Sequence, residues 1–273
     1  MHGNAGVEAL FLPFDPGKRF VLFYPARNHA AKGAVLYVPP FGEEMNKSRR
    51  MAAVQARAFA GAGFAVLQPD LFGTGDSTGD LWEASWQLWK RDLSMARDWL
   101  RDRAGGPLHL WGLRLGAALA LDWWKDEQAE VASALLWQPV LSGKTFMNQF
   151  LRTAVAADAL RGGAVTTDTL RQRLADEQEL EVAGYRLSQT LVQSIDDVDM
   201  SAWAQPDASL EWLEVRSASS PSPSPATSRQ INAWRERQVA VTHTTIAGDS
   251  FWGTQEIVEI PELVGASLRC LAH

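Results

Sequence analysis

Short, almost continuous apolar segments alternate along the chain with longer segments of helical spacing. Runs rich in Val, Leu and Phe are typical of parallel strands that are buried on both faces of a sheet. We predict such strands at residues 33–39, 64–70, 108–112, 133–139, 209–215 and 239–248. Residues 49–63 and 83–106 have helical periodicity and end in glycine, as helices often do. This alternation predicts an α/β fold with a doubly wound, mostly parallel sheet and right-handed crossovers.

Two segments outside this alternation predict other local structures. Residues 9–26 contain two apolar runs around the turn signal Asp15-Pro16-Gly17, which indicates an N-terminal antiparallel hairpin. Residues 217–228, SASSPSPSPATS, are rich in Ser and Pro and predict an extended, polar loop.

The composition limits the class of protein. Of the 273 residues 46% are hydrophobic and 21% charged, as in globular proteins, and no apolar run is long enough to span a bilayer. The N-terminus lacks the pattern of a secretory signal, and the single cysteine, Cys270, cannot form an internal disulfide. We therefore expect a cytoplasmic protein with no transmembrane segment, cofactor or metal. The net charge of −6 argues against a nucleic-acid partner.

Residues 109–121, HLWGLRLGAALAL, predict a buried strand that bends sharply into an alanine-rich helix. The spacing of Gly112 and Gly116 matches the nucleophile elbow G-x-S-x-G. Arg114 stands where the elbow has its serine. With this pattern and this order of elements, the chain resembles an α/β-hydrolase from about residue 9 to residue 270.

The resemblance implies a cap domain. Residues 141–207 are mainly helical and follow the predicted strand after which α/β-hydrolases carry their cap. We expect this segment to form a helical lid, with residues 1–140 and 208–273 as the α/β-hydrolase core.

The resemblance also implies positions for a Ser-His-acid triad, and this chain departs from the pattern at each of them. The stretch after the strand that follows the cap contains no carboxylate, and Ser219 takes the acid position. Ser250 takes the histidine position after the last strand, as Arg114 takes that of the nucleophile. His109 and His243 lie within predicted strands, where hydrogen-bonded core histidines are favoured over catalytic ones.

Other parts of a hydrolase site are present. Residues 37–51, YVPPFGEEMNKSRRM, would form the oxyanion loop, in which Gly42 would let backbone N–H groups approach a ligand. Residues 69–80, PDLFGTGDSTGD, match a D-x-x-G-x-G-x-S loop that shapes the strand end in many α/β-hydrolases. The sequence thus predicts a hydrolase cavity without serine-hydrolase chemistry.

A narrower resemblance depends on several motifs taken together. They are PPFGEEMNKSRRM, PDLFGTGDS, WGLRLGAALAL, LLWQPVLSGKTFMNQFL, LEVAGYRLS and FWGTQEI. In combination they resemble the second type of hydrolase-like protein associated with the bacterial exosortase A system. That resemblance implies an exopolysaccharide context, a neighbouring hydrolase-like protein, and an elbow in which arginine is the normal residue.

An arginine at the elbow needs a negative neighbour. The start of a helix carries partial positive charge, which disfavours a cation there by about 0.3–1 kcal/mol. Acidic residues in the flanking loops could form an ion pair with it: Glu43, Glu44 and Asp249. Alternatively Arg114 and the amides of Gly42 and Leu115 could converge on a phosphate, a carboxylate or an acidic sugar.

Aromatic and basic residues complete the set of candidates. Trp82, Trp86 and Trp89 have helical spacing and predict one packed face, whereas Trp252, near the histidine position, is expected to line the pocket. The cluster at 46–50 is predicted to begin a helix with solvated charges rather than to bind a ligand.

These features favour a non-catalytic binding or partner subunit, with a small anionic, acyl or glycan ligand or a neighbouring hydrolase-like protein as its partner. The alternative is an atypical hydrolase or acyltransferase, in which Glu43 or Glu44 activates water and Arg114, with the Gly42 and Leu115 amides, stabilises an oxyanion. A purely structural partner is a third hypothesis.

Overall fold

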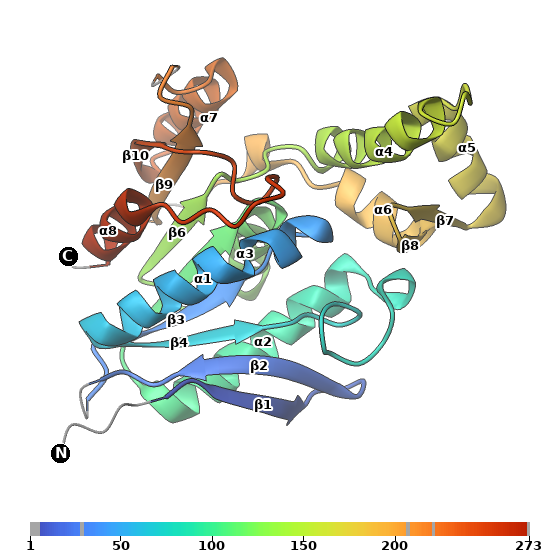
Figure 1. Ribbon diagram of the computed structural model, residues 1–273. Coiled ribbons are helices and arrows are strands. Elements are labelled where there is room, and N and C mark those ends of the chain that lie inside the picture. Colours follow the sequence, from blue (N-terminus) through green and yellow to red (C-terminus); the bar gives the residue numbers. More distant parts are fainter. Residues whose placement is uncertain (1–5, 28–29, 206–207, 220–221, 272–273) are drawn as a thin grey trace.

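The computed structural model describes residues 6–27, 30–205, 208–219 and 222–271. An eight-stranded sheet lies between two layers of helices, with strand order β1-β2-β4-β3-β5-β6-β9-β10 (Figure 1). β1 pairs antiparallel with β2, and β2 with β4, whereas every later pair of neighbours is parallel. The predicted doubly wound α/β sheet with an N-terminal hairpin is confirmed.

The strands of this sheet are β1 (Glu8–Pro13), β2 (Lys18–Tyr24), β3 (Gly33–Val38), β4 (Phe64–Pro69), β5 (Leu108–Leu113), β6 (Ser133–Trp137), β9 (Ser209–Arg216) and β10 (Ala240–Ala247). The helices are α1 (Glu43–Ala62), α2 (Trp86–Ala104), α3 (Leu115–Glu127), α4 (Gly143–Ala159), α5 (Thr167–Glu177), α6 (Gln189–Asp196), α7 (Pro225–Glu236) and α8 (Pro261–Cys270). Every predicted strand is present, with ends that differ by one or two residues.

The two faces of the sheet have separate cores. Helices α1 and α8 cover one face, and α2, α3 and α7 cover the other, together with part of the segment 141–207. Strands β3 and β6 are buried along their whole length, which explains why they have no polar positions at alternate residues.

Three local predictions were wrong. The predicted oxyanion loop at 37–51 is shorter than expected, because α1 begins at Glu43, before the cluster at 46–50 where a helix start was predicted, and Gly42 with a φ of 57° turns the chain directly into the helix. The Ser/Pro-rich segment is extended only in part: Ser224 caps α7, and the following proline suits the first helical position. Trp82 lies in a short 3-10 helix, Leu81–Glu83, outside the helix that contains Trp86 and Trp89.

The segment 141–207, which we call the cap segment, contains helices α4, α5 and α6. It also contains a two-stranded hairpin, β7 (Glu179–Val182) and β8 (Tyr185–Ser188), and the short 3-10 helix η2 (Met200–Ala202). Arg171 of α5 binds the Asp196 carboxylate of α6 at 2.5 and 3.1 Å. The segment is therefore held together by its own contacts as well as by the core.

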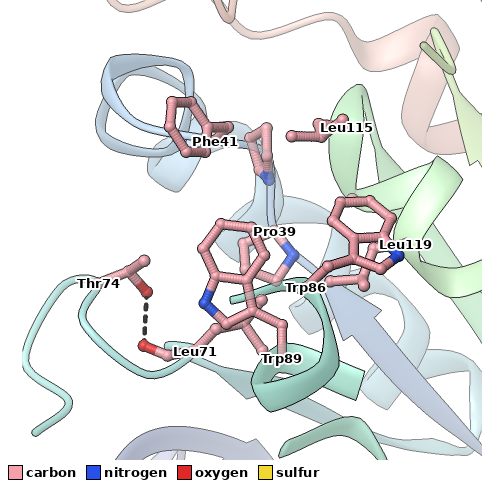
Figure 2. Close-up of a pocket in the computed structure, with 10 residues that line it drawn as sticks. Pro39, Phe41, Leu71, Thr74, Trp86, Trp89, Leu115 and Leu119 are labelled. Atoms are coloured by element: carbon pink, nitrogen blue, oxygen red, sulfur yellow. Dashed lines mark hydrogen bonds between the residues drawn. The ribbon is translucent and has the colours of Figure 1, made fainter. Parts of the chain in front are cut away.

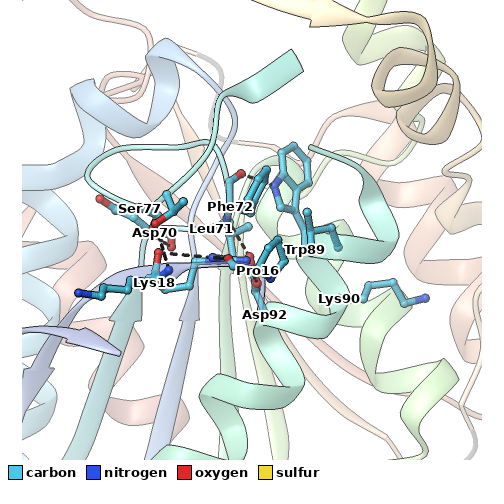
Figure 3. A network of polar contacts seen from close by, with 12 residues as sticks. Pro16, Lys18, Asp70, Leu71, Phe72, Ser77, Trp89, Lys90 and Asp92 are labelled. Atoms are coloured by element: carbon cyan, nitrogen blue, oxygen red, sulfur yellow. Dashed lines mark hydrogen bonds and ion pairs between the residues drawn. The ribbon is translucent and has the colours of Figure 1, made fainter. Parts of the chain in front are cut away.

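The loop after β4, which includes Leu71 and Phe72, lies beside Asp92 of α2 (Figure 3), and Asp92 forms a buried ion pair with β2. Arg19 and Asp92 are both 0% exposed, with Nη2 and Oδ1 2.8 Å apart. The Asp92 carboxylate also accepts the backbone N–H of Phe72 at 2.7 Å, and the Phe72 carbonyl accepts the Trp89 indole N–H at 3.0 Å. The loop position is thus tied to β2 and to α2.

Among the helices of the described residues, none combines the length and apolar character that crossing a membrane requires.

Candidate functional site

The connection between β5 and α3 has the backbone geometry of a strained elbow. Arg114 has φ 56° and ψ −121°, a conformation that costs a non-glycine residue about 1–3 kcal/mol. Its N–H donates to the Trp137 carbonyl at 2.9 Å, and its carbonyl accepts the amides of Ala117 and Val140 at 3.1 and 3.2 Å. Neighbouring backbone therefore holds the strained turn even though no nucleophile occupies it.

The two elbow glycines are required by packing. A Cβ on Gly112 would lie 2.4 Å from the Ala117 Cα, and one on Gly116 would lie 2.3 Å from the Pro39 carbonyl oxygen. Both distances are far below van der Waals contact with backbone that cannot move away. The G-x-x-x-G spacing is thus needed for α3 to pack on the strand ends, whichever residue lies between the glycines.

The Arg114 side chain lies between α1 and the loop after β10. Its Nε donates to Glu44 Oε1 at 3.1 Å, and its Cζ is 5.5 Å from the centre of the Trp252 ring. The side chains of Arg114 and Glu44 are 17% and 22% exposed. Within the described part of the chain, no hydrogen bond reaches the two terminal nitrogens of Arg114, so the ion pair has one hydrogen bond instead of two.

Glu44 lies in the first turn of α1, where the helix dipole favours a carboxylate. Burial nevertheless raises its pKa, against the lowering effect of the Arg114 charge and hydrogen bond. Its second oxygen, Oε2, is buried and has no hydrogen-bond partner among the residues that the structure describes. The pair is therefore incompletely satisfied on both sides.

The other predicted carboxylates lie elsewhere. Glu43 accepts hydrogen bonds from the Tyr185 hydroxyl at 3.1 Å and from Asn46 at 3.2 Å, and so links α1 to the cap segment. Burial and the Glu43 charge raise the pKa of Tyr185 to about 12. Asp249 is exposed, and no contact joins it to Arg114 among the described residues.

The predicted glycine and amide positions surround the elbow. A Cβ on Gly42 would lie 3.5 Å from Phe150 and 3.8 Å from Tyr185, both of the cap segment, so the cap segment covers this position. Leu115 lines a small apolar cavity on the other side of the elbow.

Serine residues occupy the two remaining predicted triad positions. Ser219 and Ser250 are both exposed, and the Ser219 N–H lies 3.4 Å from Ser217 Oγ. Two residues beyond Ser250, Trp252 is 7% exposed and covers the Arg114 guanidinium. The loop after β10, where the resemblance places a histidine, therefore contributes the Trp252 indole, which lies against Arg114.

The structure reveals an acid–histidine pair that the sequence analysis did not identify. His243 Nε2 on β10 lies 3.0 Å from Glu214 Oε2 on β9, and Glu214 is 2% exposed. Glu214 also accepts hydrogen bonds from Thr227 at 3.0 Å and from the Ser224 amide at 3.3 Å. Burial alone would raise the pKa of Glu214, but the bonds from His243, Thr227 and Ser224 lower it.

This pair lies on the face of the sheet opposite to the core that contains Trp252, the aromatic neighbour of Arg114. Glu214 shares its face with Trp212, which packs against Trp234 of α7 and against His243. Trp252 belongs to the core under α1 and α8. Because side chains alternate along a strand, the sequence could have indicated that Glu214 shares a face of the sheet with Trp212. It could not have indicated that His243 is the partner of Glu214.

His109 is a core histidine. Its Nδ1 lies 2.8 Å from Ser133 Oγ, the side chain is buried, and burial lowers its pKa. The other histidine positions, 2, 29 and 273, lie outside the described residues.

Apolar side chains line a small pocket beside the elbow (Figure 2). A cavity of about 20 Å³ lies among Pro39, Phe41, Trp86, Trp89 and Leu115. Because a single water needs about 10–15 Å³ by the same measure, the cavity has no room for an acyl chain.

The basic residues of α1 have structural partners. Lys47 Nζ donates to the Gly253 carbonyl at 3.2 Å, and Arg50 Nε lies 2.5 Å from Glu259 Oε1. Both contacts join α1 to the segment between β10 and α8. The helix that carries Glu44 and the loop that carries Trp252 are thereby held together.

Comparison with known proteins agrees with the α/β fold. Residues 29–192 match the family model described as serine aminopeptidase, S33. The chain belongs to this S33 family. Among curated proteins, no sequence match is found.

Solved structures similar to this S33-family chain are α/β-hydrolases. Est1E from Butyrivibrio proteoclasticus with bound ferulic acid has 15% identity and a TM-score of 0.66, with 96% of each chain covered. A soluble variant of the monoglyceride lipase from Saccharomyces cerevisiae, in complex with a substrate analogue, has 15% identity and a TM-score of 0.65, covering 100% of this chain and 97% of that one. XC6422 from Xanthomonas campestris, described as a serine hydrolase without lid, has 15% identity and a TM-score of 0.57, covering 97% and 93%. At such low identity these likenesses establish the α/β-hydrolase fold alone.

Proposed function

We propose that this S33-family chain is a non-catalytic binding or partner protein. The observation that carries the proposal is the elbow itself, where Arg114 pairs with Glu44 and lies under Trp252. Serine-hydrolase chemistry needs an activated nucleophile and a base within hydrogen-bond reach, and the elbow side chain is neither. The nearly filled cavity beside the elbow supports the same conclusion.

The test is a direct assay for hydrolysis. Wild-type protein and Arg114→Ser are assayed with aryl esters such as feruloyl esters, with monoacylglycerols and with aminoacyl arylamides. The first two substrate types are suggested by the names of similar structures. We expect both proteins to remain at the buffer rate and to resist labelling by a fluorophosphonate. Robust turnover by Arg114→Ser would show that a usable base lies near the elbow.

A second candidate is supported by one observation. Glu44 has a raised pKa and a buried, unpartnered oxygen, which are properties of a general base. In that case Glu44 would take a proton from water while Arg114 stabilised the oxyanion. This candidate would be favoured over the non-catalytic one if the wild-type protein hydrolysed a substrate slowly, the Glu44→Gln variant lost this activity and the Glu43→Gln variant kept it.

We further propose that the partner is a second hydrolase-like protein of an exosortase A and exopolysaccharide system. The support is the combination of the GLRLG elbow with the EEMNKSRR and FWGTQEI segments. The test is co-expression with the neighbouring hydrolase-like protein that this proposal requires, followed by size-exclusion chromatography. We expect a heterocomplex, and separate elution at micromolar concentration would contradict the proposal.

A further inference from the structure

A second pocket lies between α1 and strands β2 and β4. Its volume is about 290 Å³, near the lower limit of the range of about 300–1,000 Å³ that is usual for small-molecule sites. Leu22, Met45 and Ala53 give it an apolar surface. It shares only Pro39 with the small cavity at the elbow.

Buried polar side chains line this pocket. Tyr37, Gln68 and Asp70 are 5%, 8% and 5% exposed. Gln68 Nε2 donates to the Ala52 carbonyl at 3.1 Å, and no hydrogen bond within the described residues uses its Oε1. A ligand hydroxyl could therefore donate to this oxygen, because the amide is already oriented by its other end.

Two arginines of α1 also line the pocket and make its lining net positive. Arg49 binds both Asp70 oxygens through Nη1 and Nη2, at 3.3 and 3.2 Å, which leaves its Nε without a partner among the described residues. Arg50 binds Glu259 through Nε alone, and these side chains are 55% and 42% exposed. An exposed pair of this kind contributes about 0–1 kcal/mol, so the Arg50 terminal nitrogens remain available to an anion.

We propose that this pocket binds a small organic anion, a carboxylate or phosphate ester about the size of one sugar ring. Its charged group contacts Arg49 and Arg50, because guanidinium groups match carboxylate and phosphate oxygens. Its body lies on the apolar surface, with a hydroxyl directed at Gln68. The pocket shares no residue with the Arg114, Glu44 and Trp252 cluster, so this proposal is independent of the proposed function.

The experiment is isothermal titration calorimetry of the full chain with glucuronate, glucose 6-phosphate and glucose. We expect saturable binding of at least one of the two anions, with a millimolar or lower Kd, and none of glucose. The two anions distinguish a carboxylate site from a phosphate site. Failure of both anions to bind the wild-type protein would overturn the proposal.

Matched variants locate the site. Arg50→Gln is expected to weaken binding about tenfold, since it removes a charge-assisted hydrogen bond. Ala53→Leu, which fills the pocket with a good helix former, is expected to abolish it. Arg57→Gln makes the same charge change on an exposed position of α1 outside the pocket and should leave binding unchanged. Equal weakening by Arg50→Gln and Arg57→Gln would contradict a site here.

A spectroscopic measurement separates local binding from a general effect of charge. In protein with labelled methionine methyl groups, the anion should shift the Met45 resonance, which Met45→Leu assigns, and leave that of Met147 in the cap segment unchanged. Tight binding to Ala53→Leu, or a shift at Met147 without one at Met45, would place the anion elsewhere and refute the proposal.

Discussion

Glu44 at the elbow and Glu214 at the β9–β10 edge of the sheet are both paired with a basic side chain, but their environments have opposite effects. Glu214 accepts bonds from His243, Thr227 and the Ser224 amide, which together outweigh burial and lower its pKa. Glu44 has one bond, to Arg114, and burial prevails, so its pKa is raised. Glu214 has three hydrogen-bond donors and a second cation, Arg216, 3.8 Å away, whereas Glu44 has one donor, so the surroundings of Glu214 stabilise a carboxylate charge better than those of Glu44.

The largest expected effect is on stability at Glu214. Glu214→Gln removes the charge that three donors stabilise, and we expect the free energy of unfolding to fall by about 3 kcal/mol. Urea unfolding followed by circular dichroism measures it. Glu236→Gln on the exposed side of α7 is the matched control, expected within about 0.5 kcal/mol of wild type. Equal decreases in the free energy of unfolding of Glu214→Gln and Glu236→Gln would show that the bonds around Glu214 do not stabilise its charge.

The two glutamates should also give opposite pH dependence. Because the pKa of Glu214 is lowered from 4.5 on folding, its stabilising contribution is present above 4.5 and is lost as the pH falls through the lowered value. The pKa of Glu44 is raised from 4.5, so its contribution is complete below 4.5 and is lost as the pH rises through the raised value. Unfolding of wild type, Glu44→Gln and Glu214→Gln between about pH 3.5 and 7 tests both signs. A variant curve parallel to that of wild type would refute the shift at that residue.

A smaller effect is expected from the elbow backbone. Arg114→Gly and Arg114→Ala remove the same contacts to Glu44 and Trp252, but only glycine tolerates a φ of 56° without strain. We expect the glycine variant to be more stable than the alanine variant by about 1 kcal/mol. Equal stability in urea would mean that the turn relaxes when the side chain is removed.

The smallest effect is expected where the cap segment meets α1. Tyr185→Phe removes the hydroxyl that donates to Glu43 at 3.1 Å. Since both groups are partly solvated, the loss should be about 0.5–1 kcal/mol. Limited proteolysis within the cap segment should then be faster than in Tyr24→Phe, a control outside this contact. An unchanged cleavage rate would show that the hydroxyl does not hold the cap segment on α1.

The parts of the fold that were predictable are those with a strong periodic signal. Continuous apolar runs such as β3 and β6 are buried on both faces, so their composition alone identifies them. The start of α1 was placed a few residues too late, because its first turn is polar and charged and its helical state depends on the turn at Gly42. The β7–β8 hairpin was missed because four-residue strands give too short a pattern within a helical segment.

The candidate site was predictable only where residue spacing fixes geometry. Arg114 could be placed at the elbow because the two glycines and the strand–helix change define that turn. Arg114 pairs with Glu44, and not with Glu43 or Asp249, because of the direction in which α1 leaves Gly42. No local sequence pattern specifies that direction.

The order of strands and helices and the position of Arg114 at the turn between β5 and α3 could be predicted from the amino-acid sequence. They could be predicted because these properties depend on residues close together in the chain. Three arrangements depend on the packing of the folded chain: Trp252 lies beside Arg114, Glu214 pairs with His243, and Arg49 and Arg50 line a pocket with Gln68. These contacts join residues far apart in sequence, and their distances depend on how whole helices pack against the sheet.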